Sequence, residues 1–214
     1  LIAEAKRTAP LALAKDPRVV KALLLAGADK TPISSWVHTP TQPLDEHYGA
    51  GQVNIAASYS VLVGGRQPPA HTWLPYSGWD RGTSGTSRYF FAVPAGQPLR
   101  FSAILTWHRE IAPDPSWTAF SSALANLNLR LSAATPEHAV GQPLAESRSR
   151  VDNVEHIYLP ALPEGYYVLE VTGEAGVAYG LAWWGATEPH PGAPSAPAKQ
   201  PEPELFHQLT NGAS

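Results

Sequence analysis

The stretch LRFSAILTW at residues 99–107 decides the fold of this chain, because apolar and polar residues alternate along it. Successive side chains of a strand point to opposite faces, so a strand with this pattern buries one face and exposes the other to solvent. The same alternation returns in LNLRLSAA at residues 127–134 and in YYVLEV at residues 166–171. The turn-forming residues Pro163 and Gly165 stand just before the last of these runs. The pattern predicts a mainly β fold, an antiparallel β-sandwich or jelly roll.

Six strands are expected in all, at intervals of about ten to twenty residues that show no helical period. This spacing favours antiparallel pairing within a sandwich. The expected strands cover residues 86–93, 99–107, 127–134, 154–159, 166–172 and 177–184.

Helices are expected before the strands. Residues 1–8 have the pattern of the last turns of a helix that starts without a cap. Asp16 and Pro17 mark the start of a second helix, since a carboxylate caps free N–H groups and proline suits the first helical position. Apolar residues then recur at helical spacing up to Gly27, and a third helix is expected over about 52–62.

The composition divides the chain into four regions. Residues 1–63 are expected to hold the helices, with a loop over the polar, proline-containing stretch 31–47; residues 64–85 are expected to be a connecting segment and residues 86–185 the β-sandwich. Residues 186–214 are a proline-rich tail or linker, because such a composition buries too little apolar surface to offset its ordering entropy. We expect the helical region to be an incomplete domain.

Charge and composition exclude several classes of partner and site. The net charge is −3, and the 15 Lys and Arg residues form no basic stripe, which argues against nucleic acid as a partner. No apolar run in the sequence reaches the length of a membrane span. Cysteine is absent, so disulfides and thiolate metal sites are excluded.

Two sets of residues occur in the order in which one protein family carries them. The first set is Pro17, Val20, Lys21 and Leu24, then Gly49, Gly51, Val53, Asn54 and Ala57. The second set is Tyr89, Phe91, Val93, Ala95, Gly96, Pro98, Leu99 and Trp107, then Asn126, Leu127, Asn128, Leu129, Asp152, Asn153, Val154 and Glu155, and last Gly165, Tyr167, Leu169 and Val171. On these motifs the chain resembles the C-terminal part of a subtilisin-like serine protease (subtilase). The resemblance covers the end of the catalytic domain and the C-terminal β-sandwich domain that follows it.

The resemblance implies a secreted serine endopeptidase that hydrolyses peptide bonds in proteins or peptides. Its Ser–His–Asp triad would lie upstream of Leu1, so this segment holds no catalytic residue and is itself catalytically incomplete. The catalytic domain of the same chain is then its partner. Helices 16–27 and 52–62 are expected to pack on the catalytic sheet, while the sandwich braces that domain or guides substrate. The alternative is a noncatalytic secreted β-sandwich module that binds a protein or a glycan.

The string GTSGTS at residues 82–87 has the letters that subtilases carry at their nucleophile. In that family the serine begins a helix, whereas Ser84 and Ser87 lead directly into the expected strand at 86–93. We therefore expect a turn here rather than a nucleophile.

The resemblance suggests calcium as a cofactor, since hard oxygen ligands suit this ion. The candidate ligands are Asp152, Glu155, Asn126 and Asn128. The two asparagines supply no negative charge, which weakens a site built on their strand. The alternative is structural: the Asn153 amide satisfies neighbouring backbone groups, and Glu155 pairs with Arg100 or Arg130 across the sheet.

Aromatic and histidine side chains leave two further alternatives open. Either Trp107, Trp183 and Trp184 form an exposed platform for a polysaccharide or peptide, or alternation along the strand buries one of the last two and turns the other outward. His108 and His156 either meet in a metal site or remain a pair of surface histidines.

Overall fold

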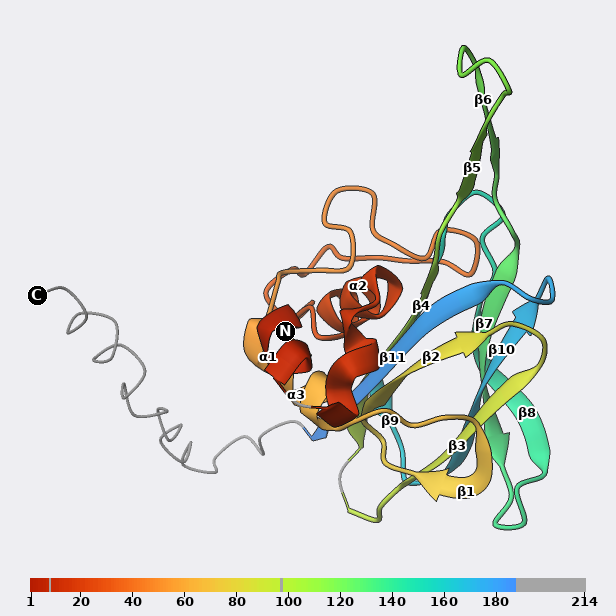
Figure 1. The fold of residues 1–214 in the computed structure, drawn as a ribbon. Helices are drawn as coiled ribbons and strands as arrows, with labels where there is room; N and C mark the ends of the chain where they lie inside the picture. The colour runs from red at the N-terminus through yellow and green to blue at the C-terminus, as the bar shows by residue number, and fades with distance from the viewer. Residues whose placement is uncertain (8, 97, 188–214) are drawn as a thin grey trace, which may run out of the picture.

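The computed structural model describes residues 1–7, 9–96 and 98–187. Two sheets pack face to face and confirm the predicted antiparallel β-sandwich (Figure 1). The five-stranded sheet has the order β1 (Ala70–Leu74), β3 (Ser87–Val93), β10 (Gly165–Gly173), β7 (Leu127–Ala134) and β8 (Val140–Ser147). The four-stranded sheet has the order β2 (Gly78–Thr83), β11 (Ala178–Thr187), β4 (Leu99–Trp107) and β9 (Val154–Leu162). Neighbouring strands of both sheets are antiparallel, apart from β1, which runs parallel to β3.

The core lies between the two sheets, where the alternating apolar side chains meet. Phe101 and Leu105 of β4 are fully buried and belong to one apolar cluster with Leu129 of β7 and Leu169 of β10. Phe91 of β3 stacks on Phe101, with ring centroids 5.1 Å apart. The alternation that predicts the fold is therefore the alternation that builds its core.

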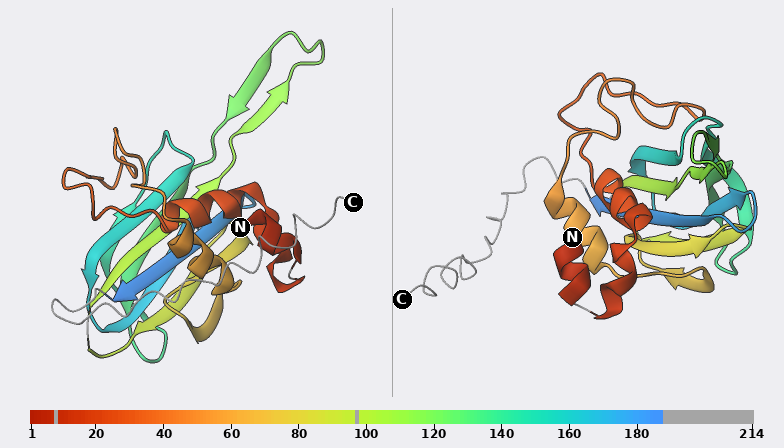
Figure 2. Two further views of the ribbon diagram at one scale, coloured as in Figure 1. Left: turned by 90° about the vertical axis from the view of Figure 1, so that its left-hand side faces the viewer. Right: turned by 45° about the horizontal axis from the view of Figure 1, so that its top comes forward.

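Helices lie over the outer face of the four-stranded sheet (Figure 2). They are α1 (Ile2–Arg7), the 3-10 helix η1 (Ala9–Lys15), α2 (Pro17–Ala26) and α3 (Ile55–Val63). Asp16 caps α2 as predicted, because its side chain accepts a hydrogen bond of 3.0 Å from Arg18 N. Asn54 caps α3 through a hydrogen bond of 3.0 Å from Ala57 N, so this helix begins three residues later than the expected start at Gln52.

Strands occur in each of the six predicted segments, and the pattern missed others. Residues 64–85, predicted as a connecting segment, contribute β1 to one sheet and β2 to the other. Trp79 of β2 is fully buried, so this segment is part of the sandwich. The pattern also missed β8, because most of its residues are exposed and show no alternation.

A two-stranded arm stands away from the sandwich, formed by β5 (Glu110–Pro113) and β6 (Phe120–Ala123) (Figure 1). Every residue of both strands is exposed. Trp117 lies in the turn at the tip and is 73% exposed. The Asp114 carboxylate holds this turn by accepting hydrogen bonds from neighbouring backbone N–H groups.

None of the helices among the described residues has the length and apolar character needed to cross a bilayer. The tail predicted at 186–214 lies outside the described residues from residue 188 onward. Its first two residues belong to β11.

Candidate functional site

The helices bind to one sheet of the sandwich, and this interface is the first part of the candidate site. Val19 and Leu23 on the inner side of α2 are fully buried. They share an apolar cluster with Trp79 of β2, Ile104 of β4 and Ala182 of β11. This differs from the expected packing on a catalytic sheet. The inner face of α2 is covered by the sandwich itself, so another partner has access only to its outer face.

Polar contacts fix the position of α2 on the sheet. The Asp16 carboxylate accepts hydrogen bonds of 2.6 Å from the guanidinium groups of Arg18 and of Arg81 on β2. These bonds, the Arg18 bond foremost, hold the pKa of Asp16 well below its ordinary value. Thr106 Oγ1 of β4 donates a hydrogen bond of 2.7 Å to Arg18 O. At Gly180 of β11 a Cβ would lie 2.5 Å from the Arg18 carbonyl carbon, so a larger residue has no room beneath the helix.

The outer side of α2 is largely apolar and half-buried. Val20, Leu24 and Leu25 line, with Ile2 of α1, a shallow hollow of about 340 Å³, to which Lys15, Pro17 and Lys21 also contribute. The side chain of Ile2 is 47% exposed.

The outer side of α3 has the same character. Ile55, Tyr59 and Val63 are 56, 43 and 52% exposed, whereas Val61 and Leu62 on the other side are fully buried. A helix that is apolar all round is typical of one that is covered on both sides. We therefore define Ile2, Val20, Leu24, Leu25, Ile55, Tyr59 and Val63 as the outer helix face.

The loop between α2 and α3 is fastened to the outer face of the same sheet. The backbones of Asp29 and Gln52 exchange two hydrogen bonds of 2.8 Å, which close the loop at its base. Farther along, Pro43 O lies 3.2 Å from Nδ1 of His156 on β9. The ring of Trp36 packs edge-on against the same imidazole, with centroids 5.5 Å apart.

A serine, a histidine and a lysine meet beneath this loop, a cluster that the sequence did not predict. Ser102 Oγ lies 3.2 Å from His156 Nε2 and 3.4 Å from Lys30 Nζ. A serine beside a base is the arrangement of an activated nucleophile. However, Ser102, His156 and Lys30 are only 1, 0 and 5% exposed, and the adjoining cavity of about 10 Å³ has no room for a substrate. The cluster therefore holds the loop on the sheet.

Burial disfavours the charged forms of the basic groups in this cluster. It lowers the pKa of Lys30 to about 7, and it lowers the pKa of His156 well below the ordinary value. The pKa of His38, whose ring centroid lies 5.7 Å from that of His156, is lowered for the same reason. The Lys30 ammonium makes cation–π contacts with the rings of Tyr158 and Trp36, at 4.9 and 5.6 Å from their centroids.

Ser84 is a turn residue, as the sequence predicted. Its hydroxyl donates to Glu174 O and accepts a hydrogen bond of 2.9 Å from Val177 N. These bonds tie the β2–β3 turn to the β10–β11 turn. Ser87 is the first residue of β3.

The four candidate calcium ligands lie in different surroundings. Glu155 is fully buried, its Oε2 accepts a hydrogen bond from the Ser147 hydroxyl, and burial raises its pKa to about 8. Asp152 accepts a hydrogen bond of 2.7 Å from Ser149 Oγ. Asn126 and Asn128 line a groove that holds no Asp and one Glu, described below. Among the described residues, no three His, Cys, Asp or Glu side chains gather to hold a metal ion.

The structural alternative holds for Asn153 and is wrong for Glu155. Asn153 Nδ2 donates a hydrogen bond of 2.8 Å to Trp107 O, and its Oδ1 accepts one of 3.2 Å from Lys21 Nζ on α2. The predicted partners of Glu155 are engaged elsewhere: Arg130 with Glu146 and Arg100 with Asp29.

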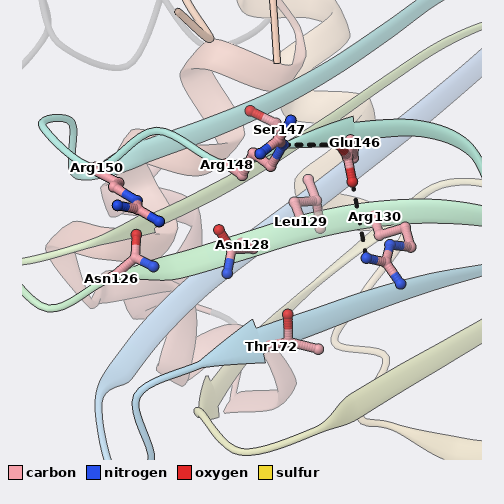
Figure 3. Close-up of a pocket in the computed structure, with 9 residues that line it drawn as sticks. All are labelled: Asn126, Asn128, Leu129, Arg130, Glu146, Ser147, Arg148, Arg150 and Thr172. Atoms are coloured by element: carbon pink, nitrogen blue, oxygen red, sulfur yellow. Dashed lines mark hydrogen bonds and ion pairs between the residues drawn. The ribbon is translucent and has the colours of Figure 1, made fainter. Parts of the chain in front are cut away.

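The groove of Asn126 and Asn128 lies between β7, β10 and the end of β8 (Figure 3). We call it the arginine groove, and its volume is about 210 Å³. Its lining residues are Asn126, Asn128, Leu129, Arg130, Glu146, Ser147, Arg148, Arg150 and Thr172. Figure 3 shows Arg150 beside Asn126 at one end, Arg130 beside Glu146 at the other, and Asn128 between them.

The predicted tryptophan platform is wrong. Trp107 and Trp183 are buried in the core, and Trp184 alone of the three turns outward, where the Arg100 guanidinium lies 5.5 Å from its ring centroid. This outcome matches the alternative based on strand alternation. His156 is fully buried beside His38, whereas His108 is exposed, so both alternatives for this pair, a shared metal site and a pair of surface histidines, are wrong.

An aromatic cluster instead covers one end of the outer face of the five-stranded sheet. The Trp73 ring of β1 stacks on His138 at 4.2 Å and packs against Tyr166 of β10 at 4.6 Å, between centroids. Phe90 of β3 packs edge-on against His138 and is almost fully buried. Sequence reasoning missed this cluster because Trp73 lies in the segment interpreted as a connection.

Comparisons with known proteins do not place the chain in a family. No protein-family model matches it, and no curated protein matches it. Among solved structures, a protein from Sulfurospirillum deleyianum aligns with a TM-score of 0.27 at 8% identity, over 51% of this chain and 98% of the other. PliG from Aeromonas hydrophila, a periplasmic lysozyme inhibitor of g-type lysozyme, aligns with a TM-score of 0.26 at 18% identity, over 50% of this chain and 84% of the other. These TM-scores are too low to carry an argument about fold or function.

Proposed function

We propose that this chain is the C-terminal part of a secreted subtilisin-like serine endopeptidase. In the full-length protein, peptide-bond hydrolysis takes place on a catalytic domain upstream of Leu1. The helices of this segment are the last helices of that domain, and the β-sandwich braces it or guides the protein substrate. The segment contributes no member of the catalytic triad.

The observation that carries this proposal is the two-sided apolar character of the helices. Their inner side is covered by the sandwich. On the outer helix face, Ile2, Ile55, Tyr59 and Val63 are exposed, whereas Val20, Leu24 and Leu25 are half-buried. A helix layer between two domains needs two such sides, because each side buries apolar surface against a different neighbour. The order of the motifs along the sequence identifies that second neighbour with a catalytic domain.

The gene tests the first half of the proposal. The DNA upstream of Leu1 is expected to encode, in frame, a G-T-S-x-A-x-P motif with the histidine and aspartate motifs of the triad farther upstream. A signal peptide directly before Leu1, or an unrelated domain there, would overturn the proposal.

A substitution on the outer helix face tests the second half. In the full-length protein, Leu24→Glu is expected to lower the temperature at which peptidase activity is lost, because the carboxylate would be buried against the catalytic domain. Leu144→Glu on β8 is the matched control, since Leu144 is 51% exposed on the other sheet. Equal inactivation temperatures of the two variants would contradict a role of this face in bracing.

The rival function is a noncatalytic secreted module that binds a protein or a glycan through the sandwich. The specific observation that favours it is the arginine groove, a polar concavity on the sheet face that the helices leave free. Binding of the isolated chain to a ligand there, together with an upstream sequence that lacks the triad motifs, would select this function over the first.

A further inference from the structure

The arginine groove concentrates positive charge on a protein whose net charge is −3. Arg130, Arg148 and Arg150 line it together with one carboxylate, that of Glu146. The Glu174 carboxylate lies beyond one end and accepts a hydrogen bond of 2.7 Å from Asn126 N. Three guanidinium groups against one lining carboxylate leave the groove itself with an excess of two positive charges.

The ion pairs within the groove leave donors free. Glu146 lies 2.8 Å from Arg148 Nε and 3.8 Å from Arg130 Nη2. Within the part of the chain that the structure describes, Arg150 has neither an ion pair nor a hydrogen bond. A guanidinium carries five N–H donors, so each of the three arginines keeps donors for a further acceptor.

Uncharged side chains complete the lining. The amides of Asn126 and Asn128 and the Thr172 hydroxyl add donors that need no counter-ion. Among the described residues, the buried Oδ1 of Asn126 has no hydrogen-bond partner. Planar guanidinium groups next to amide donors match an anion that presents several oxygens in different directions.

We propose that the arginine groove binds a tetrahedral oxyanion, either sulfate or a phosphate monoester. Arg150 would bind its oxygens from one end, and Arg130 and Arg148, which share Glu146, from the other, while Asn128 would bind from the base of the groove. This site is independent of the proposed peptidase, because it requires neither a catalytic domain nor the outer helix face. A calcium ion is disfavoured at the same place, since the excess charge has the wrong sign.

The test is a titration of the chain with inorganic sulfate, inorganic phosphate and acetate, each at constant ionic strength in chloride and followed by amide NMR shifts. We expect saturable shifts at residues of the groove with sulfate or phosphate, and weaker binding of acetate, which offers only two oxygens in one plane. Binding of sulfate but not phosphate would point to a sulfated ligand, and the reverse to a phosphorylated one. Equal binding of all three, or shifts spread over the whole surface, would overturn the proposal.

A pair of variants separates a built site from general charge attraction. Arg150→Gln is expected to weaken binding of the preferred anion about tenfold, the loss expected for one charge-assisted contact. Its thermal midpoint should stay unchanged, because Arg150 holds nothing in the fold. Arg88→Gln is the matched control: it removes the same charge from the same sheet, outside the groove, and should change affinity less than about twofold. Equal weakening by both substitutions would overturn the site, and Asn128→Asp, which adds a repelling carboxylate, gives an independent check.

Discussion

The two outer faces of the sandwich differ, although the strands that form them share one core. On the four-stranded sheet the outer face is covered: Trp79, Ile104 and Ala182 are buried beneath the helices, and Ser102 and His156 are buried beneath the loop between α2 and α3. On the five-stranded sheet a row of charges crosses the strands, in which Glu170 of β10 lies between Arg88 and Arg130. The outer face of the four-stranded sheet is therefore covered by other elements, whereas part of the outer face of the five-stranded sheet is open to water or a polar ligand.

The difference shows which side chains of a strand indicate that another element covers the sheet. Inward side chains are mostly apolar in both sheets, with the buried carboxylates of Asp80 and Glu155 as exceptions, so they indicate the core and not an outside neighbour. Outward side chains differ, because an apolar residue there gains free energy only if another element covers it. In β4 nearly every residue is buried, whereas β8 is exposed along most of its length.

The largest expected loss in the free energy of unfolding comes from truncating Trp79, which is buried beneath the helices. Trp79→Ala should lower the free energy of unfolding by about 4 kcal/mol, since it leaves a large cavity between α3 and β2. It also removes the hydrogen bond of 3.0 Å from Trp79 Nε1 to Leu62 O. Urea unfolding measures the change. Trp117→Ala at the exposed tip of the arm is the control, with an expected change within about 0.5 kcal/mol; similar losses in both variants would contradict the comparison.

An effect of intermediate size on the free energy of unfolding is expected from Lys30, which lies in the loop between α2 and α3. Its pKa is about 7 in the folded chain, against about 10.4 in an unfolded chain. Between these values the unfolded state binds more protons, so stability from this group rises with pH and is lost as the pH falls toward 7. From pH 8 to pH 9 the wild type should gain about 1.4 kcal/mol relative to Lys30→Met.

Urea unfolding of both proteins at the two pH values checks this slope. The comparison of slopes cancels the titration of Glu155 and of the histidines, which both proteins retain. Parallel pH profiles for the wild type and Lys30→Met would show that Lys30 is solvated, and that the loop does not seal this part of the sheet.

The smallest effect is expected on the charged row of the open face. Arg88 lies 3.0 Å from Glu170; the Arg88 side chain is 46% exposed and that of Glu170 is 8% exposed. Arg88→Gln should change the free energy of unfolding by about 1 kcal/mol, because the half-exposed arginine is screened by water while the carboxylate keeps Arg130 as its other neighbour. A loss comparable to that of Trp79→Ala would mean that the row is a structural element of the sheet and would remove the contrast between the faces.

The core and the first helix cap could be predicted because both depend on local patterns. Alternation placed Leu105 and Leu129 inside, and the pair Asp16–Pro17 marked the start of α2. Strand β2 could not be predicted, because its apolar residue Trp79 stands between glycine and charged residues and finds its cover only in three dimensions. The same holds for β8, an edge strand whose polar residues pair with the backbone of β7.

The candidate sites depend on residues that are distant in the sequence. Lys30 and His156 meet only because the loop folds back onto β9, so no spacing in the sequence indicates their cluster. The sequence singled out Asn126 and Asn128 as weak calcium candidates. Arg130 stands two residues from Asn128 on β7, but Arg148 and Arg150 come from the turn after β8, so the positive charge around the asparagines required the fold.

The closed base of the loop between α2 and α3 has a consequence for the integrity of the chain. Because Asp29 and Gln52 are joined by two backbone hydrogen bonds, a cut by a foreign protease between them would leave both new ends anchored. The severed pieces would migrate together in a native gel and separate only in denaturant. The fold is thus able to survive as two noncovalently associated fragments.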